Sequence, residues 1–546
     1  MTSALRRANI QGYTAESDGR FALRARRGNQ QKTDIYMKKS TLIALAAIVA
    51  GAAAAEIKLP QIFSDNMVLQ AEMPNKIWGT ADSNAQVAVK TEAGTVKTKA
   101  DADGKWTVFT AKMKKSFEPK TLEFFENGKL KKTLKNVLVG EVWVLGGQSN
   151  MAWSLRATDS FGEAEKNINK NVRFFVQPRH MAKKPQADSP KGSNWIVLDQ
   201  KNIKSNLSAI GYYFGDMLSK KLDTPVGLLD TPLGGTMMCC WIDEGKMTSK
   251  ANKEYLEKFK KLEAEFDYQK VKADYDKKLA DFDAKHKGKK LTDKEAAARK
   301  QIVRFKPNSL SPWRPQETPC YMYNGTIAPI AGYTARGFAW YQGESDAPFP
   351  HRVSFADTFK TLIAAWRGYW VKPDMPFYFF QLPSFETRSV WAEVRQAQAD
   401  VAKSLKNVGM ICIVDTGTQH DIHPRDKRPV AKRLFESVMR HTYADKSFKP
   451  DFPEMKSVKF DGKRAVVGFK TFGAHLKAQG ENAPVEVLVN GKWQNAQAKI
   501  VSRNQIEVNA DGEITGVRYA WKSWAKPEVW LFNENGLPAV PFQVQK

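Results

Sequence analysis

One stretch of the chain decides how its sequence is interpreted: VWVLGGQSNMAW, residues 142–153. Four apolar residues lead into two glycines and then into Gln148, Ser149 and Asn150. An apolar run of this kind is typical of a strand that is buried on both faces, and the glycines allow a tight turn before a helix. Ser149 is therefore either a nucleophile exposed at a strand end or a cap for the next helix.

Mostly apolar runs of the same kind recur after residue 138, with helical patterns between them. Strands that alternate with helices predict an α/β fold with a parallel sheet, and function is expected at the carboxyl ends of its strands. Polar, glycine-bearing segments follow these runs, so they are expected at that edge. The predicted strands are 142–145, 172–176, 226–229, 338–341, 377–382 and 409–414, and the clearest helices are 209–221 and 390–405.

The sequence on either side of the α/β part has a different pattern. Short alternating runs, separated by turns such as Asp103-Gly104 and Asn490-Gly491, predict accessory β-sandwich regions. A densely charged stretch with apolar residues at helical spacing predicts a long amphipathic helix or a helical hairpin. The predicted domains are a β-sandwich (56–137), an α/β domain in two parts (138–245 and 310–444), the helical insertion between them (246–309) and a C-terminal β region (445–546).

The N-terminus has the layout of an export signal. Residues 37–55 carry two lysines, an apolar stretch and small residues before Glu56, which predicts a signal peptide cleaved after Ala55. We expect residues 1–36 to lie upstream of the natural start, either because the start codon is mis-called or as a disordered, non-native extension. We expect an exported protein, periplasmic or secreted, and no membrane span in the mature chain, because the apolar run is shorter than the roughly 20 residues that cross a bilayer.

Composition argues against several partners. The formal net charge is +27, but the cationic residues are scattered rather than interleaved with aromatic residues, so no nucleic-acid partner is expected. The spacing of the four cysteines resembles no zinc site, and we expect them to be small buried side chains. One disulfide, from Cys239 or Cys240 to Cys320, is the alternative in an oxidising compartment. We expect neither a metal nor a cofactor.

A general base has few candidates, because the chain holds seven histidines. His420 and His423 directly follow the last predicted strand, at the same sheet edge as Ser149. The others lie in the charged insertion, in polar loops, or towards and beyond the end of the α/β region. His423 is favoured as the base because Asp421 is close to it in sequence and Pro424 stiffens the loop. His420 is assigned a structural or substrate-facing role.

Four sequence blocks follow one another along the chain: GGQSNMAW (146–153), GLLDTPLGGTMMCCWID (227–243), YNGTIAPIAGYTARGFAWYQGESDA (323–347) and DIHPRDK (421–427). Together with the flanking segments 57–70 and 517–544, they resemble the sialate O-acetylesterase group of the SGNH (GDSL-like) hydrolases. The resemblance implies an SGNH-type three-layer α/β/α parallel sheet. It also implies a serine esterase that needs no cofactor.

The resemblance further implies roles for individual residues. Ser149 is the expected nucleophile and His423 the expected base, oriented by Asp421 or, in a Ser-His dyad, by a backbone carbonyl. The expected oxyanion hole consists of the backbone N–H groups of Ser149 and Gly235 and the side chain of Gln342. Further residues are expected to bind substrate or to shape the site: Gln148, Asn150, Glu344, Asp346 and His420.

The implied substrate is an O-acetylated sialic acid, which loses its acetyl group through an acetyl-serine intermediate. An esterase for acetylated xylan or another glycan is the nearest alternative. Two alternatives come from other classes of protein. One is a glycoside hydrolase that uses Glu344 and Asp346 as paired carboxylates, and the other is a non-catalytic glycan-binding protein. The sequence predicts no oligomeric state.

Overall fold

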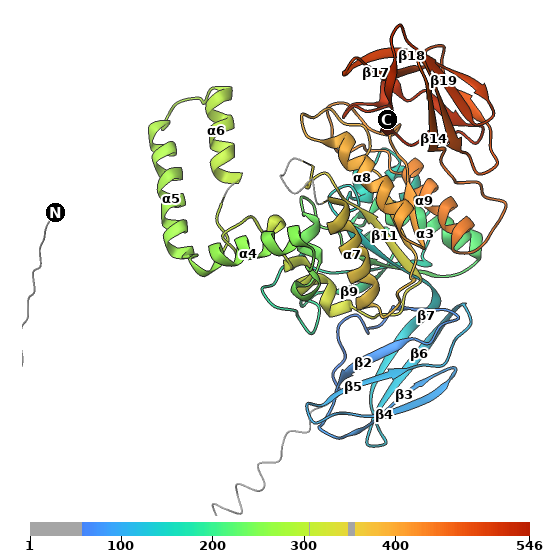
Figure 1. Cartoon of the computed structure of the whole chain (residues 1–546). Coiled ribbons are helices and arrows are strands. Elements are labelled where there is room, and N and C mark those ends of the chain that lie inside the picture. The colour runs from blue at the N-terminus through green and yellow to red at the C-terminus, as the bar shows by residue number, and fades with distance from the viewer. Residues whose placement is uncertain (1–56, 305, 348–354) are drawn as a thin grey trace, which may run out of the picture. The chain divides into compact units, whose positions relative to one another are not determined.

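The computed structural model describes residues 57–304, 306–347 and 355–546, and the predicted extension and signal peptide lie outside them. The central strands are β7 (Lys129–Gly147), β8 (Val172–Val176), β9 (Asn194–Val197), β10 (Val226–Asp230), β11 (Gly337–Tyr341), β12 (Phe377–Phe380) and β13 (Val408–Ile411). They are hydrogen-bonded in the order β13-β12-β11-β7-β10-β8-β9, and every neighbouring pair is parallel except β8 with β9. Strands β7, β9 and β11 are labelled in Figure 1. All six predicted strands of the α/β part are present.

Helices cover both faces of this sheet. The long ones are α3 (Ala209–Leu222), α7 (Phe355–Tyr369), α8 (Trp391–Ser404) and α9 (Arg428–His441), and a short α2 spans Phe161–Lys166. Trp143 and Leu145 on β7 belong to the hydrophobic cluster that includes α3 and α9. Their neighbours Val142 and Val144 point to the opposite face, into the cluster with α7 and much of α8. Burial on both faces explains the continuous apolar runs, and the mixed α/β fold is confirmed.

The N-terminal β region continues directly into the central sheet. Its strands are β1 (Val68–Gln70), β2 (Lys76–Thr80), β3 (Gln86–Thr91), β4 (Gly94–Lys99), β5 (Lys105–Phe109) and β6 (Ser116–Glu126). Strands β2 and β5 form one antiparallel pair, and β4, β3, β6 and the first part of β7 form the facing sheet. Because β7 then pairs with β10 and β11, the predicted boundary at 137/138 falls inside one strand.

The C-terminal β region is a curled antiparallel sheet. Its strands are β14 (Glu454–Asp461), β15 (Arg464–Lys470), β16 (Leu476–Ala478), β17 (Pro484–Val489), β18 (Lys492–Ser502), β19 (Gln505–Asn509), β20 (Ile514–Tyr519), β21 (Leu531–Asn533) and β22 (Phe542–Gln545). Seven of them follow the order β14-β15-β19-β18-β17-β20-β22, and β14 also contacts β20. The predicted turn at Asn490-Gly491 joins β17 to β18, and both of its residues have positive φ.

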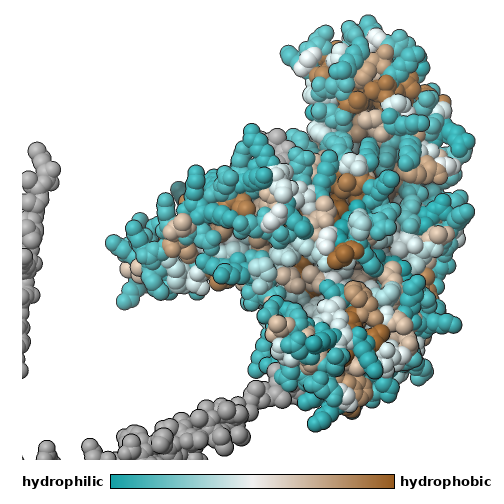
Figure 2. All heavy atoms as spheres, turned by 60° about the horizontal axis from the view of Figure 1, so that its bottom comes forward, coloured by the Kyte–Doolittle hydropathy of each residue, from teal (hydrophilic) through white to brown (hydrophobic). Residues whose placement is uncertain are grey.

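The charged insertion contains three helices: α4 (Lys250–Ala264), α5 (Tyr268–Lys285) and α6 (Asp293–Arg304). The sequence predicted one helix or a hairpin of two, so the prediction missed a helix. Asp267 separates α4 from α5 by capping the α5 N-terminus, and Gly288 turns the chain after α5 with a φ of 74°. The surface of this helical insertion is predominantly hydrophilic (Figure 2).

Short helical turns connect the remaining elements: η1 (Leu155–Ala157), η2 (Asn202–Lys204), η3 (Met238–Trp241), η4 (Glu244–Lys246), η5 (Pro315–Glu317), η6 (Tyr323–Ile327), η7 (Ala328–Ile330) and η9 (Lys526–Glu528). All four cysteines are buried, as predicted, and all are free, so the alternative disulfide to Cys320 is not formed. Among the described residues, none of the helices combines the length and the apolar character needed to cross a bilayer.

Candidate active site

The turn that follows β7 presents Ser149 at the carboxyl edge of the sheet. Gly147 has a φ of 119°, and a Cβ at this position would lie 2.1 Å from the carbonyl oxygen of Tyr341, so only glycine fits. The Gln148 N–H donates to the same carbonyl oxygen at 2.8 Å, and the Ala152 N–H donates to the Gln148 carbonyl oxygen at 2.9 Å. These contacts fix the turn and leave Ser149 at its tip.

His423 comes from the loop between β13 and α9 and contacts the predicted nucleophile. Its Nε2 lies 2.8 Å from Ser149 Oγ. The imidazole stacks on the indole of Trp153, with 5.2 Å between ring centroids and 22° between ring planes. Burial lowers the pKa of His423, and the nearby Lys427 lowers it further, whereas Asp421 opposes the shift. His423 is therefore neutral near pH 7, and its Nε2 can accept the serine proton.

The Nδ1 atom of His423, on the opposite edge of the ring from Nε2, has no acidic side chain within hydrogen-bond distance among the described residues. The Oδ1 of Asp421 lies 3.9 Å from His423 Nδ1, beyond hydrogen-bond distance, and accepts the backbone N–H of His423 at 2.9 Å instead. Within the described ranges, His423 Nδ1 donates to no acceptor. His420 turns towards Glu386, whose Oε2 lies 3.2 Å from its Nδ1. The role of Asp421 as a triad acid stays a prediction.

Two backbone N–H groups are free to bind an oxyanion. The segment after β10 lies against the nucleophile, because a Cβ added to Gly234 would lie 3.4 Å from Ser149 Cβ. Gly235 has a φ of 77°, in the left-handed region that favours glycine. As far as the structure describes the chain, the N–H groups of Ser149 and Gly235 donate to no protein acceptor. Both groups are therefore available for the expected oxyanion hole.

The side chain of Gln342 is hydrogen-bonded to the segment after β10 that carries Gly235. Its Nε2 donates to the Thr236 carbonyl oxygen at 3.1 Å and also to the carboxylate of Asp346. The two contacts use both amide protons, so donation from Gln342 to an oxyanion would need a rearrangement. Its assignment to the oxyanion hole stays a prediction.

The two carboxyl groups of the third block are buried and held by the protein. Asp346 accepts the Met238 N–H at 3.2 Å, and burial raises the pKa of Asp346 to about 7. Glu344 accepts from Asn150 Nδ2 at 2.7 Å, and burial raises its pKa as well. A glycosidase needs an acid and a nucleophile or base that both reach the substrate, so this burial argues against the glycoside-hydrolase alternative.

Three further residues of the first and last blocks lie around the site, and two of them, Gln148 and Lys427, are buried. Gln148 Oε1 accepts the Ser345 N–H at 3.1 Å, which ties the nucleophile turn to the third block. The sequence placed Trp153 and Lys427 inside the quoted blocks but gave neither a role. Lys427 is 1% exposed, and its Nζ lies 2.5 Å from Asn150 Oδ1. Its position in the last block, four residues after His423, is the only sequence signal that could have identified it.

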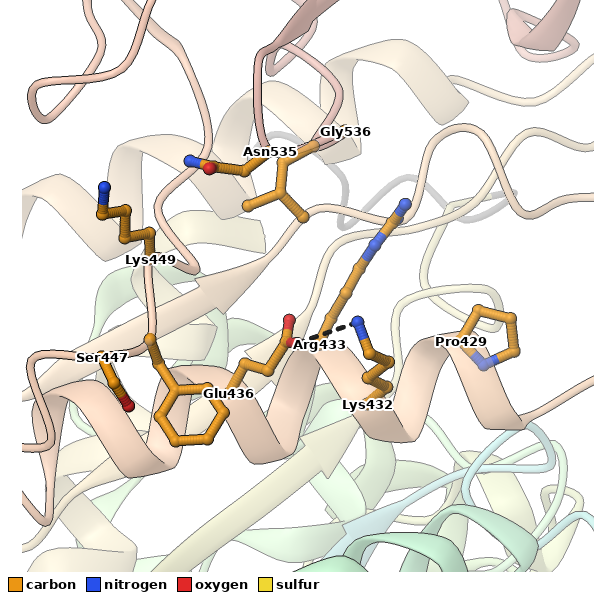
Figure 3. Close-up of a pocket in the computed structure, with 10 residues that line it drawn as sticks. Pro429, Lys432, Arg433, Glu436, Ser447, Lys449, Asn535 and Gly536 are labelled. Atoms are coloured by element: carbon orange, nitrogen blue, oxygen red, sulfur yellow. Dashed lines mark ion pairs between the residues drawn. The ribbon is translucent and has the colours of Figure 1, made fainter.

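A separate pocket lies between α9 and the C-terminal β region (Figure 3). It has a volume of about 370 Å³, and Lys432, Arg433 and Lys449 are among its lining residues. Lys432 forms an ion pair with Glu436 at 2.9 Å, and Arg433 forms one with Asp415 at 2.6 Å. None of the predicted site residues lines this pocket, so it has no direct part in the chemistry at Ser149.

A mixed α/β fold with a strand-end serine in contact with a neutral histidine is the arrangement of an α/β esterase. Residues 305–438 match the family model for carbohydrate esterases described as sialic acid-specific acetylesterases. This match includes the third block and the His423 loop.

Relatives and a solved structure extend the comparison over most of the chain. A sialate O-acetylesterase from Rattus norvegicus is 25% identical over 92% of this chain and 96% of its own length. The sialate O-acetylesterase of Homo sapiens is 22% identical over 88% and 91%, respectively. The crystal structure of a carbohydrate acetylesterase from Xanthomonas citri covers 90% of this chain and 100% of its own, with a TM-score of 0.73 and 25% identity. These matches confirm the resemblance to the sialate O-acetylesterase family.

Proposed function

We propose that the chain is a carbohydrate O-acetylesterase of the serine type, which removes O-acetyl groups from sialic acids through an acetyl-serine intermediate. The observation that carries the proposal is the 2.8 Å contact between Ser149 Oγ and His423 Nε2. A serine hydroxyl becomes a competent nucleophile when an adjacent neutral imidazole takes its proton. The helices on both faces of the sheet support the SGNH-type three-layer architecture that goes with this site.

The reaction follows from the positions of these groups. Ser149 Oγ attacks the acetyl carbonyl carbon while His423 Nε2 takes the hydroxyl proton. The carbonyl oxygen becomes an oxyanion that receives the N–H groups of Ser149 and Gly235. When the tetrahedral intermediate collapses, the bond to the sugar oxygen breaks, and His423 returns the proton to that oxygen. Water, activated by His423, then attacks the acetyl-serine and releases acetate.

The choice of sugar rests on the relatives. The curated relatives are named sialate O-acetylesterases, and the solved structure is described as a carbohydrate acetylesterase. We therefore assign O-acetylated sialic acid as the substrate. If a substrate panel shows faster acetate release from acetylated xylan or another glycan, that alternative substrate replaces it.

Export is part of the proposal. Residues 37–55 have the composition of a signal peptide, and an O-acetylated glycan is a substrate that an exported enzyme meets outside the cytoplasm. N-terminal sequencing of the protein recovered from the periplasm or the medium should begin at Glu56. Recovery of a chain that still carries residues 37–55 would contradict cleavage at this site.

The central test is the variant Ser149→Ala. We expect turnover of p-nitrophenyl acetate, and acetate release from O-acetylated sialic acids, to fall by roughly 10³-fold or more, because the nucleophile is lost. The same panel should include acetylated xylo-oligosaccharides. Ser154→Ala, on the same segment, is the matched control and should keep wild-type turnover. If folded Ser149→Ala keeps its esterase activity, the proposed function is wrong.

A further inference from the structure

Behind Ser149, three side chains from three segments of the chain form a buried polar network. The side chain of Asn150 lies between those of Lys427 and Glu344. Lys427 Nζ donates to Asn150 Oδ1 at 2.5 Å, and Asn150 Nδ2 donates to Glu344 Oε1 at 2.7 Å. None of the three is more than 5% exposed. Charged groups are rarely buried without partners, so such a network calls for an explanation.

The network connects the nucleophile turn to the loop that carries the base. Asn150 follows Ser149 in sequence, and its Nδ2 also donates to the carbonyl oxygen of Ile422 at 3.0 Å. Ile422 precedes His423. One amide group therefore joins the residue after the predicted nucleophile to the residue before the predicted base.

The two charged residues fix the orientation of this amide. A lysine ammonium only donates hydrogen bonds, and an ionised carboxylate only accepts them. In their charged forms, Lys427 therefore requires the Asn150 oxygen on its side, and Glu344 requires the nitrogen on the other. A flipped amide would set an N–H₂ group against Lys427 and an oxygen against both Glu344 and the Ile422 carbonyl. The bond to Ile422 thus depends on both charges.

We propose that Lys427 and Glu344 are positioning residues that lock the Asn150 amide, and so hold the His423 loop in register with the Ser149 turn. This inference rests on the proposed esterase function. The network does the work that a hydrogen bond from Nδ1 to an acid would otherwise do, since the Asp421 carboxylate lies 3.9 Å from that nitrogen. Lys427 touches no reacting atom, and it acts through Asn150.

The charge of Lys427 also acts on His423. The groups around the imidazole are Ser149, Trp153, Asp421 and Lys427. Lys427 is itself surrounded by Asn150, by the carboxylates of Glu344 and Asp421, and by the rings of Trp153 and Tyr341, 5.8 and 5.9 Å from Nζ. Burial lowers the pKa of Lys427 to about 7, and burial also lowers the pKa of His423 below its ordinary range, so the ammonium is largely protonated where His423 titrates. A nearby cation disfavours the imidazolium.

The test is the pH profile of kcat/KM for p-nitrophenyl acetate hydrolysis by Lys427→Met. We expect kcat to fall by about tenfold or more with little change in KM, because an interaction that positions the base is lost. We also expect the acid limb of the profile to move to higher pH, because the cation that disfavours the imidazolium is gone. Lys432→Met is the matched control, since this exposed lysine on α9 forms an ion pair with Glu436, and its profile should equal that of the wild type.

Two results would overturn the proposal. One is a folded Lys427→Met enzyme with wild-type kcat. The other is a loss of kcat with an unmoved acid limb, which would assign Lys427 a purely structural role. Lys427→Arg keeps the cation, so its acid limb should return to the wild-type position and part of kcat should be restored.

A second variant keeps the test valid if Lys427→Met fails to fold because Glu344 is left buried without its cation. The double variant Lys427→Met/Glu344→Gln removes both charges and keeps an acceptor for Asn150 Nδ2. We expect it to fold and to show the same raised acid limb, and an unmoved limb would overturn the proposal. If the wild type hydrolyses acetate esters in a Ser149-dependent way while these variants match it, only this inference fails. If the wild type has no such activity, the proposed function itself fails.

Discussion

His423 faces two different regions of the molecule. On its Nε2 side are Ser149 and, behind it, the network of Asn150, Glu344 and Lys427, in which every side chain is at most 5% exposed. On its Nδ1 side the side chain of Asp421 is 57% exposed, and it lies in a loop open to solvent. Charges interact strongly where water is excluded and weakly where water screens them. The difference indicates that the buried side, rather than the exposed acid, fixes the geometry of the base.

The largest expected effect comes from the base itself. His423→Ala should lower kcat/KM for p-nitrophenyl acetate by roughly 10³-fold, because no other described side chain lies within hydrogen-bond distance of Ser149 Oγ to take its proton. His420→Ala is the matched control from the same loop. Since His420 pairs with Glu386, and since p-nitrophenyl acetate lacks the sugar that a substrate-facing His420 would contact, its removal should change kcat/KM for this ester less than about twofold. Equal losses in the two variants would contradict the assignment of His423.

The next effect concerns the oxyanion segment. Gly235→Ala forces a side chain onto a residue with a φ of 77°, so the N–H that faces the oxyanion should shift, and kcat should fall by about tenfold or more. Gly288→Ala is the control, because Gly288 has a similar φ of 74° but lies in the helical insertion. The comparison separates backbone strain from catalysis. If both variants keep wild-type kcat, the Gly235 N–H has no role in the oxyanion hole.

Much of the fold was predictable, because both-face burial leaves continuous apolar runs. The strand predicted at 172–176 begins and ends where β8 does, and the helix predicted at 209–221 differs from α3 by one residue. The contact between Ser149 and His423 was predictable for a related reason. The carboxyl ends of parallel strands meet at one edge, so polar segments that follow β7 and β13 come together although they are far apart in sequence.

The remainder of the site depends on tertiary structure that no sequence pattern encodes. A lysine in a polar motif is normally at the surface, and the burial of Lys427 arises from Asn150 and Glu344, which other strands bring to it. Whether the Asp421 carboxylate accepts from a backbone N–H or from the imidazole is decided by torsion angles in an irregular loop. The third helix of the insertion was missed although its start is marked in the sequence, because Gly288 allows the chain to turn and Thr292 and Glu295 form a capping box directly before and within the first turn of α6.

Asp421→Asn tests the comparison from the exposed side. An asparagine oxygen can still accept the backbone N–H of His423, and the lost charge is largely screened by solvent, so kcat should fall less than about threefold. The kcat of the variant, measured with p-nitrophenyl acetate, checks this expectation. A loss of 10³-fold or more, of the size seen when a triad acid is neutralised, would show that Asp421 turns towards Nδ1 during turnover.

The smallest expected effect is on the pH dependence of the melting temperature. It tests the burial of the carboxyl group of Asp346. Burial raises the pKa of Asp346 to about 7 from its ordinary value of 3.8, so between these pH values the folded state binds a proton that the unfolded state has lost. By linkage, this group makes the folded state progressively less stable as the pH rises from about 4 to about 7. Asp346→Asn removes the titration and keeps an acceptor for the Met238 N–H. The melting temperature of the variant relative to the wild type should therefore be higher at pH 8 than at pH 5, by about 1 °C or more. Asp103→Asn, at an exposed turn, should show no such difference. If Asp346→Asn also shows no such difference in melting temperature, the Asp346 carboxyl group is hydrated in solution. The contrast between the buried and the solvent-exposed surroundings of His423 then does not extend to Asp346.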